Sequence, residues 1–274
     1  MSPKANTKKI TPFGISPNPN SLYLTPLIEA VLFRVRFTVN NRQGVTLILG
    51  DVGLGKSSVV RYLHAEFDAM DDTISLFIPR PAFKTDYSFL QTLCAGLGLP
   101  PKRSLLAQMN ELEKYLATQY QEGFNIVVFL DEAQKLTSSM LEVVRDLLNF
   151  ETSEVKLLQI VLSGQLELRE RLLSAAQKPL YSRLMAPSVL LPLTLEETLG
   201  MIEKRCQLAK IKNPFPTESI ERIFLLSVGI PRSALHLCAI SYEMSKLAKL
   251  QEVPPELIDT AFDEMKLELT DDED

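Results

Sequence analysis

The sequence predicts an α/β protein, in which a five-stranded parallel sheet flanked by helices is followed by a small helical domain. Short apolar segments alternate with longer amphipathic ones over the first two thirds of the chain, and only helical patterns follow them. Strands that are apolar throughout, rather than at every second residue, are typical of a parallel sheet covered on both faces. We predict strands at 45–50, 73–79, 125–131, 157–163 and 187–192, and helices near 56–69, 86–97, 104–120, 137–149 and 165–173.

The predicted strands end at Pro192, which marks the expected domain boundary. The helical patterns beyond it are separated by turn sequences such as "KNPFPTES" and "QEVPPE". They lie near 194–210, 216–227, 231–248 and 254–266. We therefore expect residues 1–192 to form the α/β core with an N-terminal arm, 193–266 a helical lid, and 267–274 a disordered acidic tail.

The composition is that of an ordinary globular protein, with 46% hydrophobic and 23% charged residues. Glu268 and "DDED" at 271–274 supply five acidic charges, so the rest of the chain is close to neutral despite the net charge of −5. This balance neither demands nor excludes a nucleic-acid partner. The apolar runs are far shorter than the roughly 20 residues of a membrane span. We expect a cytoplasmic protein whose Cys94, Cys206 and Cys238 are reduced and buried.

The segment "LILGDVGLGKSS" carries the pattern G-x-x-x-x-G-K-[ST] between a predicted strand and a predicted helix. Glycines allow such a loop to turn its backbone N–H groups around phosphate oxygens, and the helix that follows presents its positive end to the same anion. Lys56 can reach the β- and γ-phosphates, and the hydroxyl of Ser57 can ligate Mg²⁺. We expect a nucleoside triphosphate to be bound by Gly50, Asp51, Val52, Gly53, Leu54, Gly55, Lys56, Ser57 and Ser58.

Two adjacent carboxylates end the apolar run "IVVFLDE". An enzyme with this phosphate loop needs an acid at the end of a second strand, near the Mg²⁺, and Asp131 fits that position. Glu132 then points toward the γ-phosphate, where a carboxylate can act as general base on the attacking water. The pair therefore divides the work: Asp131 steadies the cation and Glu132 activates water.

From residue 11 to residue 265 the sequence resembles the AAA+ ATPases of the ExeA type and their transposition-helper relatives, MuB, TniB and TnsC. The segments that carry the resemblance are "PFGISPNPNSLYLTP", "DEAQKL", "LEVVRDLLNFETSEVKLLQIVLSGQLELRERL" and "VGIPRSALHLC". The resemblance implies a P-loop AAA+ core with a C-terminal helical lid, ATP and Mg²⁺ as cofactors, and assembly into a homo-oligomeric ring or filament. The last segment resembles the sensor 2 motif of the lid.

The resemblance also assigns further site residues. Ser163 or Gln165 corresponds to the sensor 1 group that reads the γ-phosphate, and the alternative stays open. Arg232 corresponds to the sensor 2 arginine, and Arg183 to an arginine finger offered to a neighbouring subunit. Arg145 and Asn149 share one helix face and could line a subunit contact or face solvent. Phe13 and Tyr23 could contact adenine or pack the N-terminal arm, and His64 and His236 are expected to be structural.

Two functions remain open at this stage. The first is a DNA-associated ATPase that assists a transposase or recombinase, with double-stranded DNA and a transposase-type protein as partners. The second is an ExeA-like ATPase of a secretion or cell-envelope assembly pathway. ExeA-type proteins carry a membrane span and a cell-wall-binding module after the ATPase core, whereas this chain ends in "ELTDDED", so we expect the DNA-linked function. The basic residues Lys4, Lys8, Lys9, Arg34, Arg36 and Arg42 are its only electrostatic support.

Overall fold

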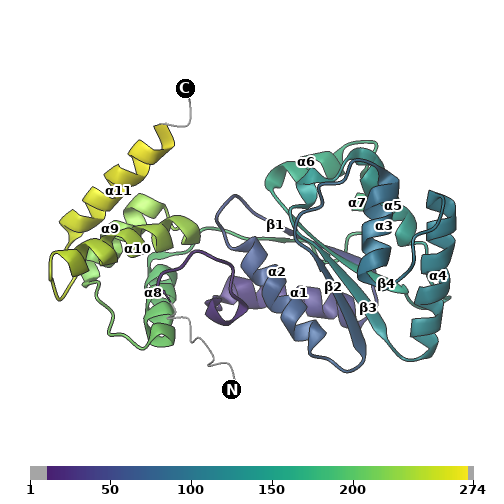
Figure 1. Ribbon diagram of the computed structural model, residues 1–274, viewed down its shortest axis with the longest axis horizontal. Helices are drawn as coiled ribbons and strands as arrows, with labels where there is room; N and C mark the ends of the chain where they lie inside the picture. Colours follow the sequence, from purple (N-terminus) through teal and green to yellow (C-terminus); the bar gives the residue numbers. More distant parts are fainter. Residues whose placement is uncertain (1–10, 271–274) are drawn as a thin grey trace, which may run out of the picture. The chain divides into compact units, whose positions relative to one another are not determined.

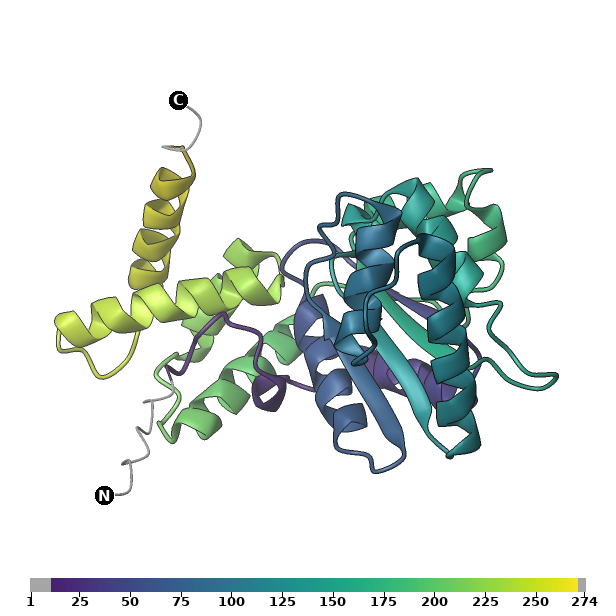
Figure 2. The same ribbon diagram turned by 45° about the vertical axis from the view of Figure 1, so that its right-hand side comes forward.

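A computed structural model describes residues 11–270, with side chains for residues 11–266 (Figures 1 and 2). The described residues form two compact units: one spans Asn18–Leu191, and the other joins the segment ending at Pro17 to the helices after Pro192. None of the helices in this part of the chain combines the length and the apolar character that crossing a membrane requires.

The first unit is built on a parallel sheet of five strands, which confirms the predicted fold class. Its strands lie in the order β2-β3-β4-β1-β5, so β4 separates β1 from β3. Because all strands are parallel, the segments that follow β1, β3 and β4 meet at one edge of the sheet, the edge formed by the carboxyl ends of the strands. The strands are β1 (Val45–Leu49), β2 (Thr73–Ile78), β3 (Asn125–Leu130), β4 (Leu158–Gly164) and β5 (Ser188–Val189).

Helices cover both faces of this sheet. The side chains of Val128 and Leu130 belong to the core that α3, α4 and α5 complete, and Figure 1 shows these helices beside one another. Phe129 points to the opposite face, where α2 places His64 with its ring centroid 5.9 Å from that of Phe129. The helices are α1 (Pro26–Asn40), α2 (Lys56–Asp68), α3 (Asp86–Gly96), α4 (Leu105–Gln121), α5 (Ser138–Leu147), α6 (Leu166–Leu173) and α7 (Lys178–Tyr181), with 3₁₀ turns η1 (Pro19–Ser21) and η2 (Ala133–Lys135).

Helix α1 was not predicted, although its start signal is present in the sequence. The Thr25 side chain accepts a hydrogen bond from the N–H of Ile28, and Pro26 occupies the first helical position. Conversely, β5 is shorter than predicted, because only Ser188 and Val189 continue the ladder alongside β1. Elsewhere, the predicted strands and helices agree with the observed ones to within a few residues.

The second unit contains α8 (Leu195–Ala209), α9 (Thr217–Ser227), α10 (Pro231–Leu247) and α11 (Pro255–Thr270). Phe13 packs into this unit with 1% of its surface exposed, edge-to-face against Phe215 and Tyr242 at centroid distances of 5.4 and 5.5 Å. We expected the N-terminal arm to belong to the α/β core, but residues 11–17 of this arm belong to the helical unit, in which Phe13 is buried. The backbone of α11 continues past the predicted end at residue 266, and residues 271–274 of the expected tail lie outside the described residues.

Candidate functional site

The phosphate loop connects β1 to α2. Gly53 and Gly55 adopt positive φ angles of 85° and 91°, a conformation that L side chains rarely adopt, and Gly55 is the residue from which α2 begins. Lys56 is only 7% exposed, and its Nζ donates to the carbonyl oxygens of Gly50 at 2.7 Å and Asp51 at 2.8 Å. The carbonyl groups of the loop therefore already hold the ammonium group beside the expected phosphate site.

The rest of the loop divides into an anchor and an exposed turn. Leu54 is 5% exposed and packs so close to Gly50 that a Cβ built there would lie 3.3 Å from Leu54 Cδ1. Asp51 and Val52 are exposed, whereas the hydroxyl-bearing Ser57 and Ser58 are half-buried at the start of α2. A buried leucine thus packs beneath the turn, beside Gly50.

Asp131 and Glu132 follow β3 and differ in their surroundings. Asp131 is 3% exposed; its N–H donates to the carbonyl of Ile78 at 3.1 Å, and its Oδ1 accepts from the N–H of Glu132 at 3.0 Å. Glu132 has the left-handed backbone conformation φ 57°, ψ 36°, which turns the chain into η2. Its Oε2 accepts from Gln134 Nε2 at 3.0 Å and lies 3.5 Å from Lys135 Nζ.

The two candidates for the residue that senses phosphate lie between these two segments. Ser163 pairs with Ile48 in the sheet register, one residue before the end of β4. Its hydroxyl is completely buried and has no hydrogen-bond partner among the described residues. Gln165 is half-buried, and its N–H donates to Gln134 Oε1 at 3.3 Å. The strand order therefore brings the phosphate loop, Asp131, Ser163 and Gln165 to the same edge of the sheet.

Arg183 lies at the opposite edge of the sheet, where the strands have their amino ends. The next residue, Leu184, pairs with Val45 at the beginning of β1, whereas the phosphate loop follows the end of that strand. The five residues of β1 separate the two edges by about 16 Å, because a parallel strand rises about 3.3 Å per residue. Arg183 Nη1 donates to Asn149 Oδ1 at 2.8 Å and to the carbonyl of Arg145 at 3.1 Å. The structure thus joins Arg183 to the carboxyl end of α5, away from the phosphate loop of its own chain. Asn149, predicted to share a helix face with Arg145, instead lies in the turn just after α5 ends at Leu147.

The other residues for which the sequence predicted a role are divided between the two units. Arg232 is exposed in the first turn of α10, in the helical unit. Tyr23 is half-buried in the α/β unit, whereas Phe13 is enclosed by Phe215 and Tyr242, so of its two predicted roles the structure supports packing. His64 is structural as predicted: its Nδ1 lies 2.7 Å from Ser75 Oγ, and its ring stacks on Phe77.

Most of the arginines that suggested a DNA-binding surface are engaged within the protein. Arg36 forms a two-pronged ion pair with Glu66 at 2.7 and 2.6 Å. Arg42 donates to the carbonyl of Phe124 at 2.8 Å, and burial lowers the pKa of its guanidinium. Arg34 lies 3.5 Å from Ser188 Oγ. The lysines Lys4, Lys8 and Lys9 lie outside the described residues.

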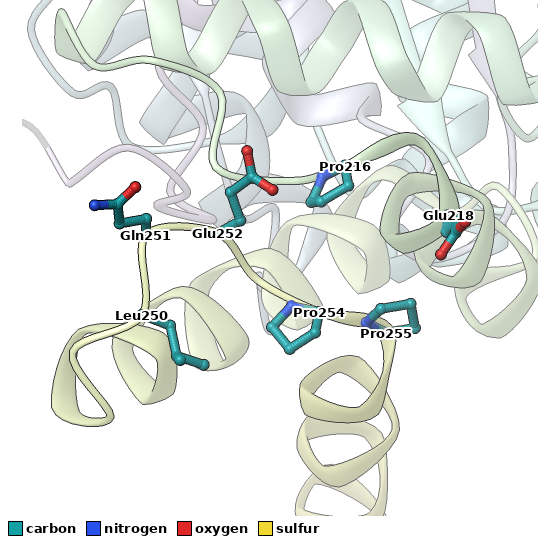
Figure 3. A pocket seen from close by; sticks show the side chains of 7 residues that line it. All are labelled: Pro216, Glu218, Leu250, Gln251, Glu252, Pro254 and Pro255. Atoms are coloured by element: carbon teal, nitrogen blue, oxygen red, sulfur yellow. The ribbon is translucent and has the colours of Figure 1, made fainter.

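A separate open cavity of about 620 Å³ lies in the helical unit (Figure 3). Three prolines and two acidic residues are among those that line it, as Figure 3 shows. No residue of the phosphate loop contributes to it. Its lining is Pro216, Glu218, Leu250, Gln251, Glu252, Pro254 and Pro255.

The site suits a cation that is bound together with phosphate. The described residues contain no group of three or more histidine, cysteine, aspartate or glutamate side chains that could hold a metal by themselves. Mg²⁺ is usually held by one or two protein oxygens together with substrate phosphates and waters. The hydroxyl of Ser57 and the buried carboxylate of Asp131, which follow β1 and β3 at the same edge of the sheet with β4 between them, are donors of this kind.

Comparison with known proteins agrees with this geometry. Residues 39–172 match the AAA domain family. The chain is 33% identical over 230 residues to General secretion pathway protein A of Aeromonas hydrophila, a match that covers 83% of this chain and 42% of that protein. The chain is thus an AAA+ ATPase that resembles those of the ExeA type. This AAA+ ATPase, an ATP-hydrolysing P-loop protein, spans less than half the length of the curated relative it matches.

Solved structures share the fold at low sequence identity. Cdc6p from Pyrobaculum aerophilum matches with a TM-score of 0.69 and 15% identity, over 90% of this ATPase and 69% of that chain. The Aeropyrum pernix ORC2 protein in its ADPNP-ADP complexes matches at 0.66 and 16%, over 94% and 72%. The Aeropyrum pernix ORC1 protein in complex with DNA matches at 0.64 and 17%, over 89% and 67%. These likenesses concern the fold.

Two residues of the site escaped the sequence analysis. Gln134 contacts Glu132 and the turn after β4, and Arg171 Nη1 donates to the carbonyl of Gln134 at 2.7 Å. Gln134 is part of the "DEAQKL" segment, so its position two residues after Glu132 was visible in the sequence. Arg171 lies 37 residues further along the chain, and no sequence signal linked it to this turn.

Proposed function

We propose that this ATPase binds ATP with Mg²⁺ on the loop from Gly50 to Ser58 and hydrolyses it at a contact between two copies of the chain. The observation that carries the proposal is the position of Arg183, at the sheet edge opposite the phosphate loop. An arginine finger placed there serves a neighbouring subunit rather than its own. Nucleotide binding then becomes linked to assembly, so the chain acts as an oligomeric nucleotide switch in a ring or filament.

The roles of the individual side chains follow from their chemistry. Lys56 exchanges its bonds to loop carbonyls for bonds to the β- and γ-phosphates. Ser57 and Asp131 hold Mg²⁺, which neutralises charge on the phosphates when it is bound. Glu132 accepts a proton from the attacking water through its carboxylate. Arg232 of the lid pairs with phosphate oxygens through its planar guanidinium.

Of the two candidates for sensor 1, we favour Ser163. Its buried hydroxyl lacks a partner among the described residues, and a buried polar group in that state is unfavourable by about 1–3 kcal/mol. A hydrogen bond toward bound phosphate, direct or through water, would satisfy it. Gln165 instead has its backbone N–H bonded to Gln134, which favours a structural part in the same turn.

For the pathway, secretion or cell-envelope assembly has the stronger support. The relative named General secretion pathway protein A is 33% identical over most of this chain. DNA-associated work as a transposition or recombination helper is the second candidate, supported by likeness to an ORC1 protein solved with DNA at 17% identity. The internal bonds of Arg36 and Arg42 leave fewer described cations for a phosphate-contacting surface, which weakens the second candidate.

The test is steady-state ATP turnover at low salt, over a range of protein concentrations, with and without double-stranded DNA. Turnover per subunit that rises with concentration supports an active site completed on assembly. Stimulation by DNA would support the DNA-linked candidate, and indifference to DNA would support a protein partner. Turnover independent of concentration, by a protein that stays monomeric, would contradict hydrolysis at a subunit contact.

A further inference from the structure

One glutamine side chain connects the two halves of the hydrolytic site. We propose that Gln134 is a positioning residue: it holds the carboxylate of Glu132 and ties it to the turn between β4 and α6. This inference rests on the proposed function, because it assumes that Glu132 is the base. It adds a residue that neither the family resemblance nor the comparisons assign.

The two ends of the Gln134 amide have different partners. Its Nε2 donates to Glu132 Oε2 at 3.0 Å, and its Oε1 accepts from the N–H of Gln165 at 3.3 Å. These partners determine the orientation of the amide, because the carboxylate can only accept and the backbone N–H can only donate. Since Gln134 engages Oε2, it leaves Oε1 of Glu132 free of this bond and able to face a water.

The backbone around Gln134 is held as firmly as its side chain. Arg171 of α6 donates from Nη1 to the Gln134 carbonyl at 2.7 Å and from Nη2 to the Leu136 carbonyl at 2.6 Å. Gly164 has no side chain, and this allows the amide of Gln134 to lie close to the turn after β4. A Cβ built at Gly164 would lie 3.1 Å from Gln134 Oε1 and 2.7 Å from Leu168 Cδ2. The turn after β3 and the turn after β4 are therefore packed as one assembly.

Glu132 needs such a restraint. It has a left-handed backbone, and its side chain is 31% exposed, so neither local conformation nor burial alone fixes the carboxylate. Lys135 is a weaker candidate for the same task. Its ammonium is 47% exposed and lies 3.5 Å from Oε2, and exposed ion pairs contribute little. A neutral, directional hydrogen bond from a side chain anchored at both ends restrains the carboxylate better.

The arrangement couples phosphate sensing to the base. The unpartnered hydroxyl of Ser163 lies one residue before Gly164 and two before Gln165, whose N–H bonds to Gln134. A shift of this turn on phosphate binding would move the acceptor end of the amide, and so the carboxylate at its donor end. Gln134 thus links occupancy of the phosphate position to the alignment of Glu132.

The experiment compares the full chain with Gln134→Met, Glu132→Gln and the double variant. Methionine keeps the length of glutamine but removes both hydrogen bonds. We measure kcat and KM at one protein concentration, and hydrolysis in single turnover with protein in excess over labelled ATP, which resolves slow rates. Gln159→Met is the matched control: Gln159 also bridges a backbone N–H and a carbonyl, at the other end of β4. Thermal unfolding of all variants shows whether each one folds.

We expect Gln134→Met to lower kcat by about tenfold or more with KM within about twofold, since an aligned general base contributes about 10²–10⁴-fold. In the Glu132→Gln background the same change should have no further effect, because Gln134 acts through Glu132. Wild-type kcat in Gln134→Met, or an equal loss in both backgrounds or in Gln159→Met, would overturn the inference. Normal turnover by Glu132→Gln would instead contradict the proposed base itself.

Discussion

Arg183 Nη1 donates to Asn149 Oδ1 at 2.8 Å, and this bond holds the guanidinium on the α5 side of the α/β unit. The bond joins two residues 34 positions apart, and the carbonyl of Arg145 completes the contact. A charged group fixed at the surface by neutral acceptors keeps its charge available to a partner. The proposed finger is thus ordered before any neighbour is present.

The finger can be tested by mixing variants. Arg183→Ala should lose most ATP turnover while it still binds ATP, because its own phosphate loop is intact. Glu132→Gln should also bind ATP and fail to hydrolyse it, yet it still offers Arg183. A mixture of the two should regain turnover, since the loop and base of one variant meet the finger of the other.

The control for this mixture is Arg103→Ala, which removes an exposed arginine and should leave turnover unchanged. Size-exclusion chromatography with ATP establishes that the two variants assemble together. Mixed oligomers without regained turnover would contradict a finger supplied in trans, as would full activity of Arg183→Ala alone.

Lys56→Ala should abolish nucleotide binding, because it removes the cation that the loop holds beneath the phosphate position. Titration of a fluorescent ATP analogue measures the loss, and thermal unfolding without nucleotide shows whether the loop remains folded. Lys114→Ala is a suitable comparison, since Lys114 is an exposed lysine on α4, outside the loop. Undiminished affinity in Lys56→Ala would remove the lysine from the site.

Phe13→Ala should destabilise the helical unit. The ring is 1% exposed between Phe215 and Tyr242, and a buried phenylalanine replaced by alanine typically costs about 3–5 kcal/mol. Ile15→Ala, two residues away at a side chain that is 50% exposed, should cost much less. Urea unfolding followed by circular dichroism measures both. Equal small effects would mean that the N-terminal arm does not stabilise these helices.

His64 should make stability depend on pH. Burial lowers the pKa of its imidazole below the usual value of 6.5, so the folded protein favours the neutral ring. The stability this gives is present above the unfolded-state pKa and is lost as pH falls through the lower folded pKa. Against His64→Phe, which keeps the stacking on Phe77, wild-type stability should therefore decline as urea unfolding is repeated from pH 8 to pH 5. A constant difference between the two proteins would contradict the lowered pKa.

Much of the candidate site was predictable because it depends on local pattern. The spacing of Gly50, Gly55, Lys56 and Ser57 identifies a phosphate loop wherever a strand precedes it and a helix follows. Asp131 and Glu132 follow from the apolar strand before them. Helix α1 was missed even though Thr25 and Pro26 signalled its start.

The sequence by itself determined the α/β class, the phosphate loop and the acidic strand end, because short-range periodicity and fixed spacings encode them. Only the tertiary structure decided which distant side chains meet. The strand order brought Ser163 between the loop and Asp131, and it sent Arg183 to the far edge. Tertiary packing likewise buries Phe13 in the helical unit and places Gln134 between the turn after β3 and the turn after β4. Such contacts depend on the registry of elements far apart in the chain, which no local pattern specifies.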